Sequence, residues 1–182
     1  MTVSREAAQA SETPASVHAG ADKLASAELR QVVPKLELTS AWFADGAPLP
    51  ARCSEDGEGV PPPLVWSEPP PRTRELALVC EDPDAPQAEP FVHWLVYSMP
   101  VSMRSLDADS VESAHQGQNS RHERGFTPAA PPPGHGTHHY HFELFALDQA
   151  LPLDDGADKA ALLDAMEGHV LAYGELIGTF TR

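Results

Sequence analysis

Cysteine is scarce in this chain, because Cys53 and Cys80 are the only two among 182 residues. Two cysteines cannot build a disulfide framework or a CxxC metal site, and Cys80, inside an apolar run, is expected to be a small buried side chain. Long apolar stretches are also lacking, since none approaches the roughly 20 residues of a membrane-spanning helix. The N-terminus, MTVSREAAQASETPAS, has no apolar core of a signal peptide. We therefore predict a cytoplasmic protein with no integral membrane association and no cofactor.

Basic residues are the second shortage. Lys and Arg together number 12 against 27 Asp and Glu, which gives a formal net charge of −15. A field of this sign repels nucleic acids and anionic membrane surfaces, so neither is an expected partner. A ligand that carries phosphate would have to be held by a local site that acts against the field of the whole chain.

Proline, by contrast, is abundant, with 19 residues that mostly separate short apolar runs. This pattern favours a mostly β fold with rigid connections over a helical bundle. Strands are predicted at Leu76 to Cys80, Phe91 to Tyr97 and Thr137 to Leu147, which are rich in aliphatic, β-branched and aromatic residues. A further strand pair is expected at residues 33–38 and 41–43, closed by the turn dipeptide Asp45-Gly46.

Helices are expected only near the C-terminus. Asp155 is a candidate N-cap for a helix over residues 157–167, which ends at Gly168. A second short helix over residues 169–177 and a closing strand over 178–182 complete the prediction. Residues 1–30 contain no aromatic residue and little apolar surface, which predicts a disordered tail before a domain over residues 31–182.

Two segments bring polar side chains to strand ends. Between two predicted strands, Asp82-Pro83-Asp84-Ala85-Pro86 cannot continue a strand, because proline lacks the N–H that a sheet needs. Two acids therefore lie near a strand terminus together with His93. In the third strand, alternation places His138 and Tyr140 on one face, directly after a long loop rich in Pro and Gly over residues 125–136.

Three interpretations of these residues remain open. Asp82, His93 and His138 could act as general acids and bases in a hydrolase, although no nucleophile motif such as G-x-S-x-G is present. A protonated His and the Tyr140 hydroxyl could instead donate to an anion. The aspartates could also simply be solvated in an edge loop. A metal site is not predicted, because His138 points to the face opposite that of His139 and His141, and His135 lies in the loop.

Several blocks together resemble one family, the phosphatidylethanolamine-binding proteins, and within it the bacterial Raf-kinase-inhibitor-like branch. The blocks are DPDAP followed by FVHWLVY, PPPGHGTHHYHFELFALD, and the C-terminal GADKAALLDAMEGHVLAYGELIGTFTR. The resemblance implies a large antiparallel sheet packed on a smaller sheet, with C-terminal helices. It also implies a small cavity that binds phosphate, acetate or phospholipid head groups. The resemblance implies that this cavity is lined by Asp82, Pro86, His93, His138 and Tyr140. Two further residues of the same blocks, Asp84 and Phe91, are added to them as candidate ligand-binding residues.

The resemblance has further implications. Cis peptide bonds are expected at Ala85-Pro86 and Glu89-Pro90, and a homodimer is expected because bacterial relatives are often dimers. In the loop, Pro128 stands where family members usually have a glycine whose N–H would point at the anion, and His139 replaces the family's arginine. We therefore predict a module that binds a small anion or phospho-ligand, and no enzyme. The alternatives are a hydrolase, or an inhibitor of a kinase or protease that acts through a protein partner.

Overall fold

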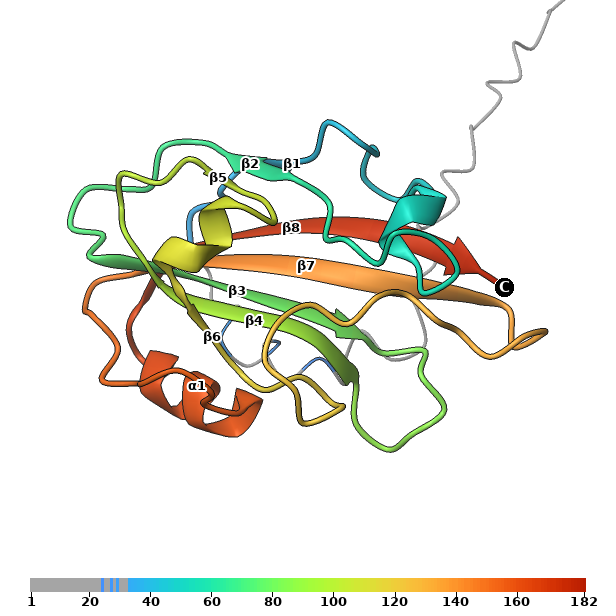
Figure 1. Cartoon of the computed structure of the whole chain (residues 1–182). Coiled ribbons are helices and arrows are strands. Elements are labelled where there is room, and N and C mark those ends of the chain that lie inside the picture. Colours follow the sequence, from blue (N-terminus) through green and yellow to red (C-terminus); the bar gives the residue numbers. More distant parts are fainter. Residues whose placement is uncertain (1–23, 25–26, 28, 30–32) are drawn as a thin grey trace, which may run out of the picture.

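The computed structural model describes residues 24, 27, 29 and 33–182 (Figure 1). Most of the predicted tail, residues 1–23, 25–26, 28 and 30, therefore lies outside the described residues. Leu24 and Leu29 are described, and both are buried. Leu29 packs with the apolar side chains on one face of the main sheet.

A five-stranded antiparallel sheet forms the centre of the molecule, with the strand order β6-β4-β3-β7-β8. Its strands are β3 (Glu75–Asp82), β4 (Phe91–Met99), β6 (His115–Gln116), β7 (Thr137–Leu147) and β8 (Val170–Thr181). The three strands expected from apolar runs thus become the three central neighbours β4, β3 and β7. Every residue of β3 is buried, because the sheet is covered on both faces.

A smaller sheet and one helix provide the two covering layers (Figure 1). The small sheet has the order β1-β2-β5 and consists of β1 (Leu38–Thr39), β2 (Leu64–Trp66) and β5 (Ser105–Leu106). On the other face lies α1 (Lys159–Met166). Two 3-10 helices, Ala51–Cys53 and Ser110–Ser113, lie in the connections. The predicted fold class, mostly β with two packed antiparallel sheets and a C-terminal helix, is confirmed.

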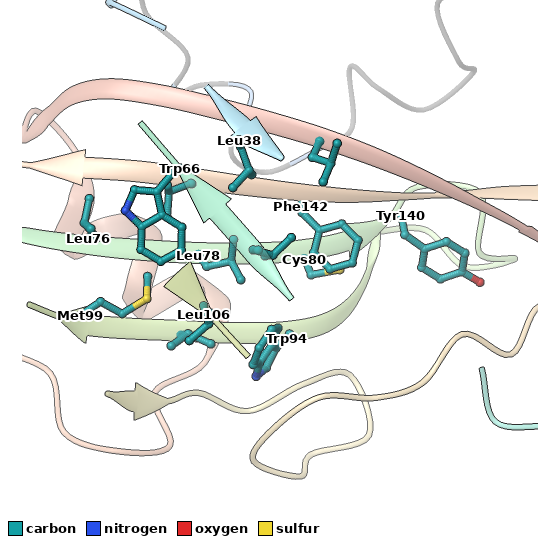
Figure 2. Packing of buried hydrophobic residues seen from close by; sticks show 14 of the residues in the cluster. Leu38, Trp66, Leu76, Leu78, Cys80, Trp94, Met99, Leu106, Tyr140 and Phe142 are labelled. Carbon is teal, nitrogen blue, oxygen red and sulfur yellow. The ribbon is translucent and has the colours of Figure 1, made fainter. Parts of the chain in front are cut away.

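Alternation along the strands divides the apolar residues between two cores. Leu76, Leu78 and Cys80 of β3 face the small sheet, and Figure 2 shows them packed with Trp66 and Phe142. Ala77 and Val79 of the same strand face the helix, where their cluster includes Leu162 and Met166. One strand therefore supports both layers, and this fixes which face each β3 side chain must occupy.

The C-terminal prediction needs one correction. Residues 169–177 do not form a second helix, because β8 pairs with β7 over its whole length, from Thr137↔Thr181 to Leu147↔Val170. The buried residues of β8 alternate with partly buried ones, which is a strand pattern that the small residues Ala172, Gly174 and Gly178 obscure in the sequence. The ladder of main-chain hydrogen bonds outweighs the local helix preference. The predicted helix is present, but its N-cap is Asp158, which accepts a hydrogen bond from the Ala161 N–H at 2.9 Å.

Two other local predictions were wrong. Leu38 and Thr39 pair with β2 and not with residues 41–43, because the Asp45-Gly46 turn is bound to Ile177 of β8. No cis peptide bond occurs in the part of the chain that the structure describes, so the bonds before Pro86 and Pro90 are both trans. Trans is the favoured isomer even before proline, by about 0.5–1 kcal/mol.

An ion pair anchors α1 to the sheet. The Lys159 ammonium lies 2.6 Å from Oε2 of Glu81, and the Glu81 side chain is completely buried near the C-terminal end of β3. Burial raises the pKa of Glu81 to about 7, although the neighbouring Lys159 lowers it. A buried carboxylate of this kind is tolerated because an opposite charge is in contact with it.

Removal of this cation should therefore destabilise the protein in a pH-dependent way. We expect Lys159→Met to lower the free energy of unfolding by about 3 kcal/mol at pH 8, where Glu81 is charged and would lose its partner. At pH 6 the loss should shrink, because the carboxyl is then protonated and needs no cation. Urea unfolding at both pH values measures this. Lys35→Met, which changes an exposed lysine, is the matched control; an equal loss in the two variants, or a loss independent of pH, would contradict the prediction.

Candidate functional site

A cavity of about 260 Å³ lies at the edge of the large sheet where β3 ends and β4 and β7 begin. Six of the seven candidate residues line it: Asp82, Pro86, Phe91, His93, His138 and Tyr140. The antiparallel pairing explains this convergence, because the last residue of β3 must lie beside the first residues of both neighbouring strands. The remaining walls come from the loop of residues 127–132 and from Arg121.

Asp84 is the candidate residue that does not line the cavity. Its carboxylate Oδ2 accepts hydrogen bonds from the His139 N–H at 2.9 Å and pairs with Nδ1 of the same residue at 2.7 Å. Asp84 thus ties the turn after β3 to the start of β7. In the same turn, the Asp84 N–H donates to Oδ1 of Asp82 at 2.9 Å, which holds the Asp82 carboxylate in place.

Asp82 belongs to a buried chain of polar groups that leads to the surface. Its Oδ2 lies 2.6 Å from Nδ1 of His138, and both side chains are almost fully buried. The other ring nitrogen of His138 lies 2.8 Å from Nδ1 of His135, which belongs to the loop of residues 125–136. Burial raises the pKa of Asp82, whereas its contact with His138 lowers it. Since both nitrogens of His138 have partners, this residue forms a wall of the cavity with its hydrogen bonds already used.

His93 reaches the cavity because of an irregularity in β4. Glu81 pairs with Val92 and Cys80 pairs with Trp94, so His93 is an extra residue in β4 at this point. This is a β-bulge, which redirects a side chain at the end of a strand. The bulge lets both His93 and Trp94 lie on the small-sheet side, where His93 lines the cavity and Trp94 joins the core.

Two hydrogen bonds connect His93 to Thr127. The Thr127 N–H donates to the His93 carbonyl at 2.8 Å, and the Thr127 carbonyl lies 2.7 Å from Nδ1 of His93. Burial lowers the pKa of His93 to about 4, with Arg121 and His138 acting in the same direction. The ring is therefore neutral near pH 7. Among the histidines that could donate a proton to an anion, His93 is disfavoured, because its buried position disfavours a second proton on the ring.

Two buried hydroxyl groups on the cavity wall have no hydrogen-bond partner among the described residues. They are the Tyr140 hydroxyl and Oγ1 of Thr127. Figure 2 shows Tyr140 at the end of the row of core side chains, with its hydroxyl directed away from them. Burial, together with Asp82, raises the pKa of Tyr140, so this hydroxyl keeps its proton and can donate it. Buried polar groups are nearly always paired, so these two hydroxyls are available to a water or to another molecule that enters the cavity.

Gln87, Arg121 and Thr127 are the polar wall residues that sequence reasoning missed. Arg121 contributes the one guanidinium group of the described cavity wall, and its Nη2 also lies 3.0 Å from Oε1 of Glu55. No motif marks Arg121, because it lies in a polar segment without periodicity. Thr127 could have been suspected, since it lies in the Pro- and Gly-rich loop. Pro128 also lines the cavity, and its Cγ packs against Gly59.

The histidine cluster does not converge on one point. His138 faces the cavity, and His139 pairs with Asp84. His141, on the same face as His139, pairs with Glu175 at 2.8 Å. Within the described part of the chain, no group of three or more His, Cys, Asp or Glu side chains is arranged to hold a metal ion.

The depressed pKa of His93 should make the protein sensitive to acid. The unfolded chain takes up a proton near pH 6.5, whereas the folded protein does so only near pH 4, so stability is lost as the pH falls between these values. We expect this group to contribute about 3 kcal/mol that is present above pH 6.5 and lost below pH 4. His93→Asn keeps a donor for the Thr127 carbonyl but cannot titrate. Unfolding curves from pH 7 to pH 4 should therefore fall less steeply for this variant; parallel curves would contradict the prediction.

Comparisons with known proteins show the family to which the chain belongs. The family model described as phosphatidylethanolamine-binding protein matches residues 39–181. A UPF0098 protein of Chlamydia muridarum is 40% identical over 151 residues, which cover 81% of this chain and 99% of the relative. A Mycobacterium tuberculosis protein that carries the name lipoprotein LppC is 40% identical over 146 residues, which cover 80% of this chain and 72% of that protein.

A solved structure is similar as well. YbcL from E. coli, described as a member of the mammalian PEBP family, superimposes with a TM-score of 0.75 at 28% identity, and covers 81% of this chain and 99% of its own. The residues that the family model matches contain every strand of the large sheet, the helix and every residue of the cavity wall. The chain described here belongs to the phosphatidylethanolamine-binding protein family.

Proposed function

We propose that this chain is a binding module for a small anion or phospho-ligand, which it holds in the cavity between β3, β4 and β7. The observation that carries the proposal is the pair of buried hydroxyls, Tyr140 and Thr127, without partners among the described residues on one cavity wall. Two unpaired donors on residues that line the same cavity are suited to two oxygens of one oxyanion. A volume of about 260 Å³ suits a head group and not a large substrate.

The local charges support a modest affinity. Arg121 is the guanidinium group on the described cavity wall, but it also forms an ion pair with the Glu55 carboxylate. Asp82 adds a negative charge to the wall, which His138 offsets through their contact. Against a chain of net charge −15, binding must therefore come from directed hydrogen bonds more than from a positive field.

The other interpretations receive less support. A hydrolase using Asp82, His93 and His138 has no serine or cysteine among the described residues of the cavity wall, and the Thr127 hydroxyl there has no hydrogen-bonded base that would activate it. No helix in the described part of the chain is long and apolar enough to cross a membrane. Cytoplasmic location, a homodimer, and regulation of a kinase or protease through a protein partner stay predictions, and the similarity to LppC makes attachment to a membrane a further alternative for localisation.

Calorimetric titration with phosphate and with O-phosphorylethanolamine tests the proposal. We expect both to bind to the wild-type protein, and Tyr140→Phe to weaken binding about ten- to a hundredfold, because a hydrogen bond to a charged group contributes about 1.5–3 kcal/mol. Tyr97→Phe is the matched control, since the Tyr97 hydroxyl donates to the Asp154 carbonyl on the opposite face of the sheet. The proposal fails if wild type binds neither compound, or if the two variants bind equally.

Pro128 allows a second test. Proline has no N–H, so the loop offers one backbone donor fewer at this point of the wall than a glycine would. We expect Pro128→Gly to tighten phosphate binding about ten- to a hundredfold, and to lower the free energy of unfolding by about 0.4–1 kcal/mol through unfolded-state entropy. Pro133→Gly controls for that entropy, because Pro133 belongs to the same loop but does not line the cavity. Unchanged affinity in a folded Pro128→Gly protein would show that residue 128 does not take the glycine's place.

A further inference from the structure

The tautomer of His93 is fixed by its neighbour. A carbonyl oxygen can only accept a hydrogen bond, so the 2.7 Å contact with the Thr127 carbonyl requires the proton of the neutral ring to be on Nδ1. The second nitrogen, Nε2, then carries a lone pair. Because His93 lines the cavity and Nδ1 is used, Nε2 is the ring atom that a bound molecule can meet. At His93, the site therefore accepts a hydrogen bond from a bound molecule and does not donate one.

The ring is also held against rotation. Phe91 and Tyr140 pack on it, with ring centroids 4.7 and 5.0 Å away. A flipped ring would place Cδ2–H where Nδ1 now lies, so the hydrogen bond to the Thr127 carbonyl would be lost. The acceptor at Nε2 is thus a fixed property of the folded site.

The groups around His93 do not change this. From β3 comes Asp82, from β7 come His138 and Tyr140, and from the connection after β6 comes Arg121. Asp82 and His138 are paired with each other, and His138 with His135 of the loop. Arg121 and His138 disfavour a proton on His93, as does burial, so its pKa of about 4 leaves the ring neutral throughout the range from pH 5.5 to pH 8.

We propose that the cavity selects an oxyanion that itself carries a proton, of the class of a phosphomonoester monoanion, whose P–OH group donates to Nε2 of His93. This inference depends on the proposed function of the same site. The charged oxygens of such a ligand would accept from the Tyr140 and Thr127 hydroxyls, so that both donors and the acceptor of the wall are satisfied together. A fully ionised anion would instead place a negative oxygen against the His93 lone pair and near the Asp82 carboxylate.

Methyl phosphate and methyl sulfate provide a matched pair of probes. Below the second pKa of a phosphomonoester, which is about 6, both are monoanions of nearly the same shape, and only methyl phosphate carries a proton. Calorimetry at pH 5.5 should show that methyl phosphate binds to the wild-type protein about ten- to a hundredfold more tightly than methyl sulfate. Between pH 6 and pH 8, the affinity for methyl phosphate should fall about fiftyfold, as the monoanion disappears. Methyl sulfate should show no such fall.

The outcomes separate this inference from the proposed function. If both compounds bind more tightly in parallel as the pH falls, the proton is taken up by a histidine of the protein, and the inference is wrong while anion binding stands. Equal affinity for the two at pH 5.5 would overturn it in the same way. If neither binds, although Tyr140→Phe and wild type are both folded, the proposed function itself fails.

Two further measurements test whether His93 recognises the proton of the ligand. At pH 8, binding of methyl phosphate should take up about one proton from the buffer, as shown by titrations in buffers of different ionisation enthalpy, because the ligand is then a dianion. His93→Asn preserves a donor for the Thr127 carbonyl and removes Nε2, so it should abolish the preference for methyl phosphate over methyl sulfate. A preference that persists in this variant overturns the role of His93. If the variant does not fold, the comparison of methyl phosphate with methyl sulfate on the wild-type protein still tests whether the ligand's proton matters.

Discussion

The two hydrogen bonds between His93 and Thr127 are the constraint on which the site depends. One uses the main chain of both residues and aligns the loop of residues 125–136 with the start of β4. The other uses the His93 side chain and fixes its tautomer. Without the first, Thr127 and Pro128 would not form a wall beside β4. Without the second, the tautomer of His93 would not be fixed. Nε2 could then either donate or accept a hydrogen bond, and the cavity would not distinguish a ligand that donates from one that accepts.

Around this contact, the central sheet provides rigid support on both sides. Asp82 ends β3, and its carboxylate is held by the Asp84 N–H and by His138. Tyr140 lies two residues after His138 in β7 and packs on the His93 ring. Because β3 is buried on both faces and paired on both edges, its end cannot shift independently of β4 or β7. The hydrogen bonds that would receive a ligand are therefore oriented before it arrives, which reduces the entropy lost on binding.

The acidity of the chain and the nature of the site fit together. A protein of net charge −15 gains little from a positive field, and its described cavity wall contains a single guanidinium group that already contacts an acid. Under the proposed function, recognition would depend on neutral donors and on the neutral acceptor of His93, so ligands would be distinguished by the proton that they carry. A site of this kind can reject other anions of equal charge, because an unpaired buried acceptor is unfavourable whatever the overall field.

Much of this was determined by the sequence alone. The apolar runs at residues 76–80, 91–97 and 137–147 were sufficient to predict the central strands, since strands buried on both faces need continuous apolar residues. The prolines after Asp82 ended β3, and the alternation in β7 placed His138 and Tyr140 side by side. These are local effects of side-chain size, periodicity and the missing N–H of proline. They place the six candidate residues near strand ends, and the antiparallel pairing of β3 with β4 and β7 brings those ends together.

What the sequence could not determine depends on contacts between distant segments. Residues 169–177 became a strand because β7 offers a free edge along its whole length, and no local pattern reports that edge. The bulge at His93 arises from the pairing with β3. The neutral state of its ring, with a single proton, arises from burial beneath Phe91, Tyr140 and Thr127. The sequence thus identified six residues that gather at the cavity, whereas the tertiary structure added Arg121 and Thr127 and decided which side chains donate and which accept, because burial and distant partners set where each proton resides.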